Sequence, residues 1–360
     1  MSRIGRWLVL FASALLAPGS AAAQSDLPRS GPDNRPPDVF PPVAPGVEER
    51  RPQPAASPYG GLNNLGLGGL GVGGPGYSVD WLPSQSVTGQ RADLGLVRQN
   101  LSLIAPVWAE GGDILLATAN LRYSRVYTDA LLPDTGRRFP RDLWNASIGL
   151  GYLRKFDNGW TGGLLVNVGS ASDKPFNSFR EMNATIAGLL RVPAWNEGDF
   201  WLFALFYSPG GLLNFPIPGI AYQWNYSDRF QLTIGIPSAL TWKPTDDLTF
   251  TASYIPLTNV RAMLDYRFRE GIHFFGGYET VNEAYFLADR ADRFDRFLSF
   301  EQRVLGGVKF DILKNATLDF HAGYAFGRRF GEGRNQGAPL HDRVDVAPGG
   351  FLGAALRLKF

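Results

Sequence analysis

Phe351-Leu-Gly-Ala-Ala-Leu-Arg-Leu-Lys-Phe360, at the end of the chain, decides the fold because two kinds of side chain alternate along it. One face of an extended strand carries Leu352, Ala354, Leu356, Leu358 and Phe360; the other carries Gly353, Ala355, Arg357 and Lys359. Side chains alternate across a strand with a period of two, so one face can meet hydrocarbon while the other meets water. The stretch therefore predicts a strand in a wall between lipid and water.

The same alternation recurs between residues 77 and 360. Apolar faces run along 115–123, 144–152, 160–168, 260–268 and 318–326, each opposite a polar or charged face. After residue 23, no run approaches the ~18–20 apolar residues of a membrane helix, and only helices and closed barrels span bilayers. We predict an all-β fold for 77–360, an antiparallel transmembrane up-and-down β-barrel. Alternation alone does not say which face is inside, so a soluble sandwich or propeller is the alternative.

Short and long connections alternate along this region, as in outer-membrane barrels with short periplasmic turns and longer outer loops. The long connections cover about 128–142, 170–180, 208–217, 281–297 and 328–349. Keeping the alternation requires splitting 229–243 at Pro237 into two short strands, which gives sixteen strands; fourteen is the alternative. Trp108, Trp160, Trp195 and Trp242 stand beside short turns, where an interfacial aromatic girdle is expected.

The first 76 residues belong to other segments. Residues 1–23 combine Arg3 and Arg6, a short apolar run and Ala21-Ala22-Ala23, which predicts a signal peptide cleaved near Ala23 after export through the Sec pathway. Residues 24–76 are rich first in proline and then in glycine and leucine, which predicts a disordered leader. A plug in the barrel or a contact with the cell wall is the alternative role.

Composition excludes several classes of function. Cleavage removes two of the 35 basic residues and none of the 33 acidic ones, so the mature chain is neutral and no nucleic-acid partner is expected. The chain has no cysteine, so it forms no disulfide and has no thiol nucleophile. No metal-ligand spacing or phosphate-binding loop occurs, and no cofactor is expected.

Charged residues on the polar strand faces are the candidate lumen lining. They are Arg98, Arg122, Arg191, Arg261, Asp265, Arg267, Glu301, Arg303, Asp319, His321 and Arg357. Basic residues predominate among them, which favours anions in a pore. Cross-strand ion pairs that merely fill the interior are the alternative.

A candidate constriction loop follows at 289–297. Its repeat supplies the charged residues Asp289, Arg290, Asp292, Arg293, Asp295 and Arg296. On a helix, Asp289 and Arg293 would pair at i, i+4, as would Asp292 and Arg296. The segment either narrows the mouth or caps the outside.

No catalytic motif is present, and we expect no enzyme. The histidines are His273, His321 and His341. Asp319 and His321 share a lumen face, and His341-Asp342 falls in an outer loop, so a hydrolase is the third and weakest reading.

Several motifs resemble an uncharacterised family of bacterial outer-membrane β-barrels, a domain of unknown function. They are Trp81-Leu-Pro-Ser-Gln85, Phe156-Asp-Asn-Gly-Trp160, Val168-Gly-Ser-Ala-Ser-Asp-Lys-Pro-Phe176, Phe215-Pro-Ile-Pro-Gly219, Pro244-Thr-Asp-Asp-Leu-Thr249 and Asn282-Glu-Ala-Tyr-Phe-Leu-Ala-Asp-Arg290. The resemblance implies a β-barrel fold and an outer-membrane location. From the C-terminal strand ending at Phe360 we expect outer-membrane lipid as a partner and insertion by the barrel-assembly machinery. The resemblance implies no substrate. We expect a porin-like channel for passive diffusion of small solutes, with a non-conducting structural or interaction barrel as the alternative.

Overall fold

The computed structural model describes residues 74–196, 198–208, 215–256 and 259–358. The predicted signal peptide, nearly all of the predicted leader, and Phe360 lie outside these residues.

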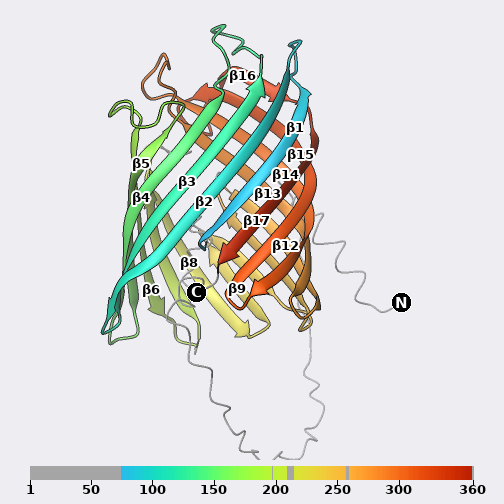
Figure 1. Cartoon of the computed structure of the whole chain (residues 1–360). Helices are drawn as coiled ribbons and strands as arrows, with labels where there is room; N and C mark the ends of the chain where they lie inside the picture. The colour runs from blue at the N-terminus through green and yellow to red at the C-terminus, as the bar shows by residue number, and fades with distance from the viewer. Residues whose placement is uncertain (1–73, 197, 209–214, 257–258, 359–360) are drawn as a thin grey trace, which may run out of the picture. The chain divides into compact units, whose positions relative to one another are not determined.

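The described chain folds into strands joined by turns and loops (Figure 1). The strands are β1 (Gly76–Ser86), β2 (Asp93–Glu110), β3 (Asp113–Thr128), β4 (Asp142–Lys155), β5 (Thr161–Ser172), β6 (Met182–Pro193), β7 (Phe200–Tyr207), β8 (Ile217–Ser227), β9 (Phe230–Gly235), β10 (Ser238–Trp242), β11 (Leu248–Ile255), β12 (Asn259–Arg269), β13 (Ile272–Tyr285), β14 (Arg296–Leu313), β15 (Ala316–Gly333), β16 (His341–Val346) and β17 (Gly349–Leu358). None of the described residues forms a helix that is long and apolar enough to cross a membrane.

The sheet closes on itself, because β1 pairs antiparallel with both β2 and β17. β16 and β17 pair with successive parts of β15, so they share one position in the wall and the barrel has sixteen positions. The split at Pro237 is confirmed: β9 and β10 form their own hairpin, with Thr233 opposite Ala239 and Phe230 opposite Trp242. The predicted fold class, an antiparallel sixteen-strand barrel, is therefore confirmed.

The outer face of the barrel is apolar. Ile148, Phe320 and Leu352, all predicted on outward faces, are exposed by 65%, 52% and 53%. Trp108, Trp160 and Trp242 are also exposed and stand at the end of the barrel that carries the short turns. We call this the lower end and the opposite one the upper end. An apolar band with aromatic residues at its border is typical of a membrane-facing surface.

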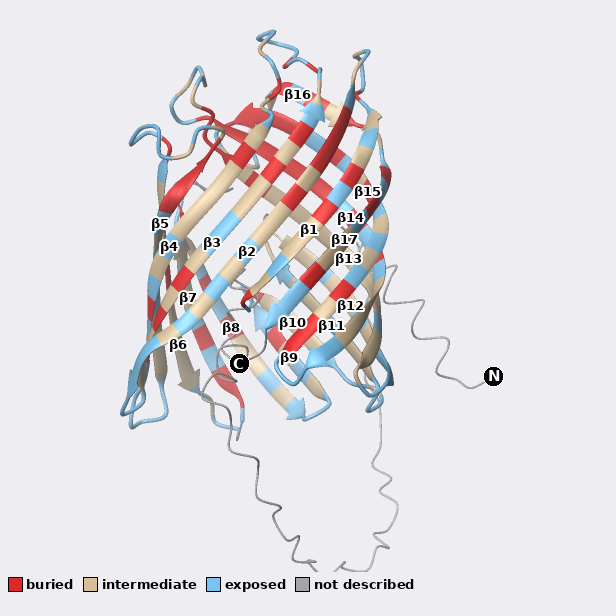
Figure 2. Cartoon of the chain, viewed as in Figure 1, coloured by how far each residue is buried: buried red, intermediate tan, exposed pale blue. Residues whose placement is uncertain are grey.

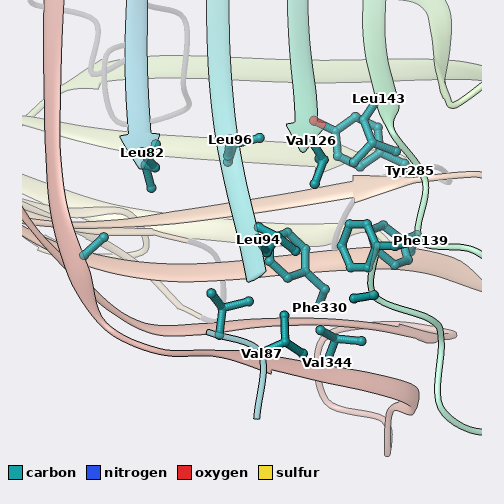
Figure 3. Packing of buried hydrophobic residues seen from close by; sticks show 14 of the residues in the cluster. Leu82, Val87, Leu94, Leu96, Val126, Phe139, Leu143, Tyr285, Phe330 and Val344 are labelled. Carbon is teal, nitrogen blue, oxygen red and sulfur yellow. The ribbon is translucent and has the colours of Figure 1, made fainter. Parts of the chain in front are cut away.

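The upper end is packed with apolar side chains on one side of the barrel. Leu94, Val126, Phe139, Phe330 and Val344 meet there in one buried cluster that draws on β2, β3, β15, β16 and the β3–β4 loop (Figure 3). Figure 2 shows buried stretches concentrated at this end. We call this cluster the upper core. It fills the upper lumen beside β1–β4 and β13–β17.

The β13–β14 hairpin leans across the lumen to complete this closure. Directly after β13, Phe286 forms a parallel bridge with Ser172 of β5, and its N–H donates to the carbonyl of Ala171 at 2.7 Å. Around the wall, β6–β12 lie between β5 and β13. The bridge therefore divides the barrel into a filled side, β13–β17 with β1–β5, and an open side, β6–β12.

Replacing Phe330 by alanine tests the upper core. Phe330 packs against Phe139 and Phe297, with ring centroids 5.2 and 6.0 Å away. We expect Phe330→Ala to lower the free energy of unfolding by about 3–5 kcal/mol, because the cavity cannot fill easily. Urea titration followed by tryptophan fluorescence measures it. Phe179→Ala, at an exposed loop residue, is the control and should change it by less than about 0.5 kcal/mol.

Candidate functional site: the lumen and its charge network

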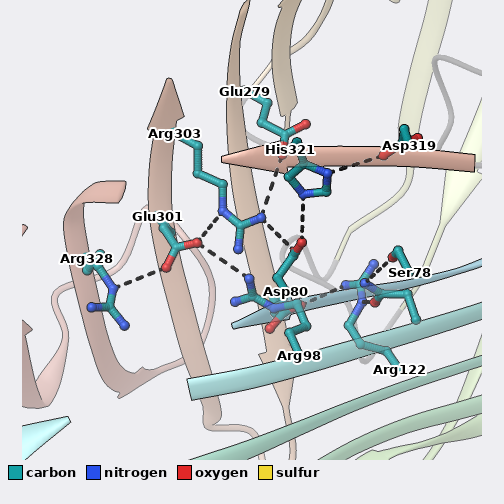
Figure 4. Close-up of polar contacts among 12 residues, drawn as sticks. Ser78, Asp80, Arg98, Arg122, Glu279, Glu301, Arg303, Asp319, His321 and Arg328 are labelled. Atoms are coloured by element: carbon teal, nitrogen blue, oxygen red, sulfur yellow. Dashed lines mark hydrogen bonds and ion pairs between the residues drawn. The ribbon is translucent and has the colours of Figure 1, made fainter. Parts of the chain in front are cut away.

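Strand register places the polar faces on the inside of the barrel. Around the wall, Ser253 lies opposite Arg261, Arg261 opposite Glu279, and Glu279 opposite Arg303. Arg303 reaches Asp80 of β1 inside the barrel (Figure 4). Directly opposed residues point to the same face, so the whole row faces the lumen.

Glu301 is the centre of a buried charge network on the filled side. Its carboxylate accepts from Arg303 at 2.5 Å, from Arg328 at 3.2 Å and from Arg98 at 3.4 Å (Figure 4). All four side chains are buried. Three guanidinium groups around one carboxylate are tolerable only if further carboxylates balance them, because an unpaired buried charge is costly.

Asp80, Asp319 and Glu283 supply that balance. Asp80 pairs with Arg303 at 2.8 Å and with His321 at 3.0 Å. Asp319 contacts His321 on its other ring nitrogen at 3.2 Å and pairs with Arg357 at 2.5 Å.

Glu283 ties together opposite parts of the wall. It comes from the upper part of β13 and lies 3.2 Å from Arg98 of β2 and 3.2 Å from Arg122 of β3. Since β1, β17, β15 and β14 lie between β2 and β13 in the wall, these ion pairs cross the lumen. They close the filled side below the upper core.

The arginines of the network are matched in number by carboxylates, and His321 lies between two of these carboxylates, Asp80 and Asp319. The arginines are Arg98, Arg122, Arg303, Arg328 and Arg357, and the carboxylates are those of Asp80, Glu279, Glu283, Glu301 and Asp319. The arginines that suggested a basic lumen thus meet carboxylates here. The sequence analysis missed Asp80, Glu283 and Arg328. Asp80 could have been found, because it lies on the polar face of the alternating stretch that forms β1. Glu283 and Arg328 could not, because the sequence predicted loops at their positions.

The remaining candidates lie on the open side, on β6 and β12, and Arg261 joins the charge network through Glu279. Asp265 contacts Lys309 at 2.5 Å and His273 at 2.8 Å, and Arg261 lies 3.7 Å from Glu279. Arg267 pairs with Asp247 of a lower turn at 2.8 Å. Arg191 instead has its guanidinium 4.0 Å from the centre of the Phe200 ring and makes no ion pair with a described residue.

The candidate constriction loop is not helical, so the predicted i, i+4 pairs do not form. Its charged residues bind neighbouring loops and strand ends at the upper end. Asp289 pairs with Arg137 at 3.1 Å, Asp292 with Arg334 at 3.0 Å, Arg290 lies 3.6 Å from Glu181, and Asp295 3.5 Å from His341. Arg293 lies over the Phe294 ring, and Arg296 is the buried first residue of β14. Because the backbone here forms turns, these charged side chains reach other loops and strand ends. In a helix, residues at i and i+4 would pair with each other instead.

The β3–β4 loop folds over the filled side and is held by Asp342. The Asp342 carboxylate accepts from the backbone N–H groups of Asp134 and Thr135 at 2.8 and 2.9 Å and from the Thr135 hydroxyl. Arg137 of the same loop reaches Asp342, Glu332 and Asp289. Burial disfavours its charge, but these carboxylates outweigh that effect and raise the pKa of Arg137.

The described histidines contact carboxylates. His321 lies between two carboxylates, and no described serine or threonine hydroxyl forms a hydrogen bond with a histidine. In the His341-Asp342 pair, the Asp342 carboxylate accepts hydrogen bonds from the β3–β4 loop and not from His341. No group of three or more His, Asp or Glu among these residues is arranged to hold a metal.

Fold and site together define a closed β-barrel with a filled side and an open side. No family model matches the sequence, and no curated protein matches it. Among solved structures, it is similar to the β-domain of the Bordetella autotransporter Brka (12% identity, 80% of this chain and 99% of that one, TM-score 0.30). It is also similar to an outer membrane channel from Pseudomonas putida F1 (10%, 79% and 95%, 0.33) and to OccK7 (OpdD) from Pseudomonas aeruginosa (11%, 80% and 100%, 0.34). Similarity at this level concerns the barrel alone.

Neutralising Glu301 tests the charge network. Glu301→Gln removes the carboxylate with which Arg328 pairs and weakens the pairing of Arg98 and Arg303. We expect a loss of about 3–5 kcal/mol in the free energy of unfolding, since buried charges lose their counter-charge. The same urea titration applies, with Glu270→Gln in an exposed turn as the control. A loss below about 1 kcal/mol would mean that the network is solvated.

Removing the Asp342 carboxylate tests the attachment of the loop. Asp342→Ala eliminates four hydrogen bonds to the β3–β4 loop, from Asp134, Thr135 and Arg137, so the loop should open more often and expose Arg137, Arg138 and Arg141 to trypsin. We expect cleavage at least about tenfold faster, as for a loss of about 1.4 kcal/mol in local stability. Asp345→Ala, which removes only an exposed pair with Arg343, should leave the rate unchanged.

Proposed function

We propose that this protein is an outer-membrane channel for the passive diffusion of small solutes. The apolar outer face, the tryptophans at the lower border and the predicted export signal support a barrel that spans the outer membrane. Lipid contacts its outside, and the barrel-assembly machinery inserts it through the C-terminal strand.

The polar inner face of the open side carries this proposal. Gln223, Thr233, Thr241, Thr251 and Ser253 share the lumen-facing row of β8–β11. Their side chains are short or neutral, and no large buried cluster covers them, in contrast to the filled side. Water and small solutes pass along this wall, while the upper core and the charge network support the opposite wall.

A non-conducting structural or interaction barrel is the second candidate. The upper core and the loop held by Asp342 favour it, because both close part of the upper end. The two functions differ in whether ions cross the barrel.

Planar bilayers distinguish them. Residues 24–360 should give steady single-channel openings under a KCl gradient if the open side conducts. Silence from a protein that is folded, as judged by its heat-modifiable mobility in gels, would refute the channel and leave the structural barrel. Repeating a silent experiment without residues 24–75 would show whether the leader is a plug.

Arg191 is the residue through which we expect the open side to favour anions. Its charge faces the lumen beside Phe200, without a carboxylate partner among the described residues. Arg191→Gln should shift the reversal potential in a KCl gradient toward cation preference. Arg343→Gln is the matched control and should leave the reversal potential unchanged, because Arg343 pairs with Asp345 on the face of β16 opposite the buried Asp342 and Val344.

A further inference from the structure

The inner face of the barrel changes polarity along β2–β6. Toward the upper end the lumen-facing positions are polar, as at Ser102 of β2, Asn120 of β3 and Asn167 of β5. Toward the lower end the same face is apolar, and we call this part the apolar stripe. Its members are Ile104, Pro106, Ile114, Leu116, Leu153, Leu165, Ala187 and Leu189.

Strand register places the stripe inside the barrel. Ile104 and Pro106 share one face of β2 with Arg98, whose ion pairs cross the lumen. From Pro106, direct opposition leads through Leu116, Gly151 and Leu165 to Ala187. A parallel row runs from Ile114 to Leu153, Gly163 and Leu189. The two rows carry no polar side chain across five neighbouring strands.

Lipid does not account for this apolar face, because the outer face of the same strands meets it. Leu103 and Leu164, on the outer face, are exposed by 48% and 51%. Within the stripe, Leu116 and Leu153 are buried in a cluster whose described members all come from the wall. The stripe residues that stay half-buried are Ile104, Ile114, Leu165 and Leu189. They offer apolar surface that is unfavourable against water and suits an apolar partner.

The chain enters the barrel next to the stripe. β1 begins at Gly76, which lies opposite Ser102 of β2, two residues above Ile104 along that strand. Pro75 is held at this point, because its carbonyl accepts from the Leu358 N–H at 2.8 Å. β2 continues downward past it (Figure 1). The residues that precede Pro75 therefore start beside the β2 end of the stripe.

The segment before Pro75 matches the stripe in composition and in length. Residues 60–73 carry no charge, and their apolar side chains are Leu62, Leu65, Leu67, Leu70 and Val72, separated mostly by glycine. When extended, residues 62–72 reach about 36 Å, whereas the four strand spacings from β2 to β6 add up to about 19 Å. The segment can therefore cross the whole stripe, and its glycines allow the backbone to approach the wall closely.

We propose that residues 60–73 bind in the lower lumen against the apolar stripe and narrow the channel there. The leucines and Val72 pack on the half-buried residues of the stripe, and Asn63 and Asn64 face water. An uncharged segment suits this stripe and not the charge network above it. The narrowing rests on the channel proposed above, whereas the binding of the segment to the stripe does not.

Thiol accessibility tests the binding without any need for conduction. The chain has no cysteine, so Leu165→Cys places one thiol in the centre of the stripe, on β5. In residues 24–360, a water-soluble methanethiosulfonate should modify this thiol at least about tenfold faster once the leucines of the segment no longer cover it. The variant combines Leu65→Asn, Leu67→Asn and Leu70→Asn. The matched control makes three such changes in the proline-rich part of the leader, Val39→Asn, Phe40→Asn and Val43→Asn, and should leave the rate unchanged.

A second thiol controls for entry of the reagent. Thr251→Cys, on the inner face of β11, should react at the same rate whether the segment is intact or altered. Equal rates at Leu165→Cys with the intact and the altered segment would refute the binding. If both rates are fast, the stripe faces water; if both are slow, the wall or another occupant covers it.

Single-channel conductance tests the narrowing. The three leucine substitutions should raise it at least about twofold in planar bilayers, because the segment then leaves the lower lumen, while the matched control should not change it. Unchanged conductance together with faster modification of Leu165→Cys would refute the narrowing and keep the binding. A silent barrel in which the segment protects Leu165→Cys refutes the channel and keeps the binding. A conducting barrel in which it gives no protection keeps the channel and refutes the binding.

Discussion

Closure of the hydrogen-bonded ladder between β17 and β1 is the constraint on which the rest of the structure depends. Inside a bilayer an unpaired backbone amide costs several kcal/mol, so a strand wall must return to its beginning. The residues that close it, Gly76 to Trp81 opposite Arg357 to Leu352, include the alternating stretch at the end of the chain. Once the ladder closes, each side chain of a strand must face either outward or into the lumen.

What the ladder places in the lumen must then be satisfied there. The barrel does this in two ways on its filled side: apolar residues pack into the upper core, and five arginines meet five carboxylates below it. Glu283 combines the two, because it pairs with Arg98 and Arg122 while its neighbour Tyr285 enters the upper core. The ion pairs that Glu283 makes across the lumen stabilise one arrangement of the β13–β14 hairpin, and the network fills part of the circumference of the lumen.

Local pattern was sufficient to predict the strands, because alternation and turn residues act over a few positions. Pro237 between two short alternating stretches was enough to give the β9–β10 hairpin and the strand number. Ion pairs across the lumen could not be predicted from the sequence. Arg98 and Glu283 are far apart in the chain, and no local pattern near either residue indicates the other as its partner. The upper core was missed for a related reason. Around Leu94, the stretch Leu94-Gly95-Leu96-Val97 has no polar residue on either face, so alternation does not indicate there which side is lipid.

The uneven height of the wall follows from the same division. The upper parts of long strands such as β14 and β15 are stabilised by burying apolar side chains, and the upper core provides that packing. Among the described residues of the open side no buried cluster of this size occurs, so an extension of β9 or β10 would gain no such packing on its inner face. The shortest strands of the described wall, β9 and β10, accordingly stand on the open side, opposite the long strands that border the upper core.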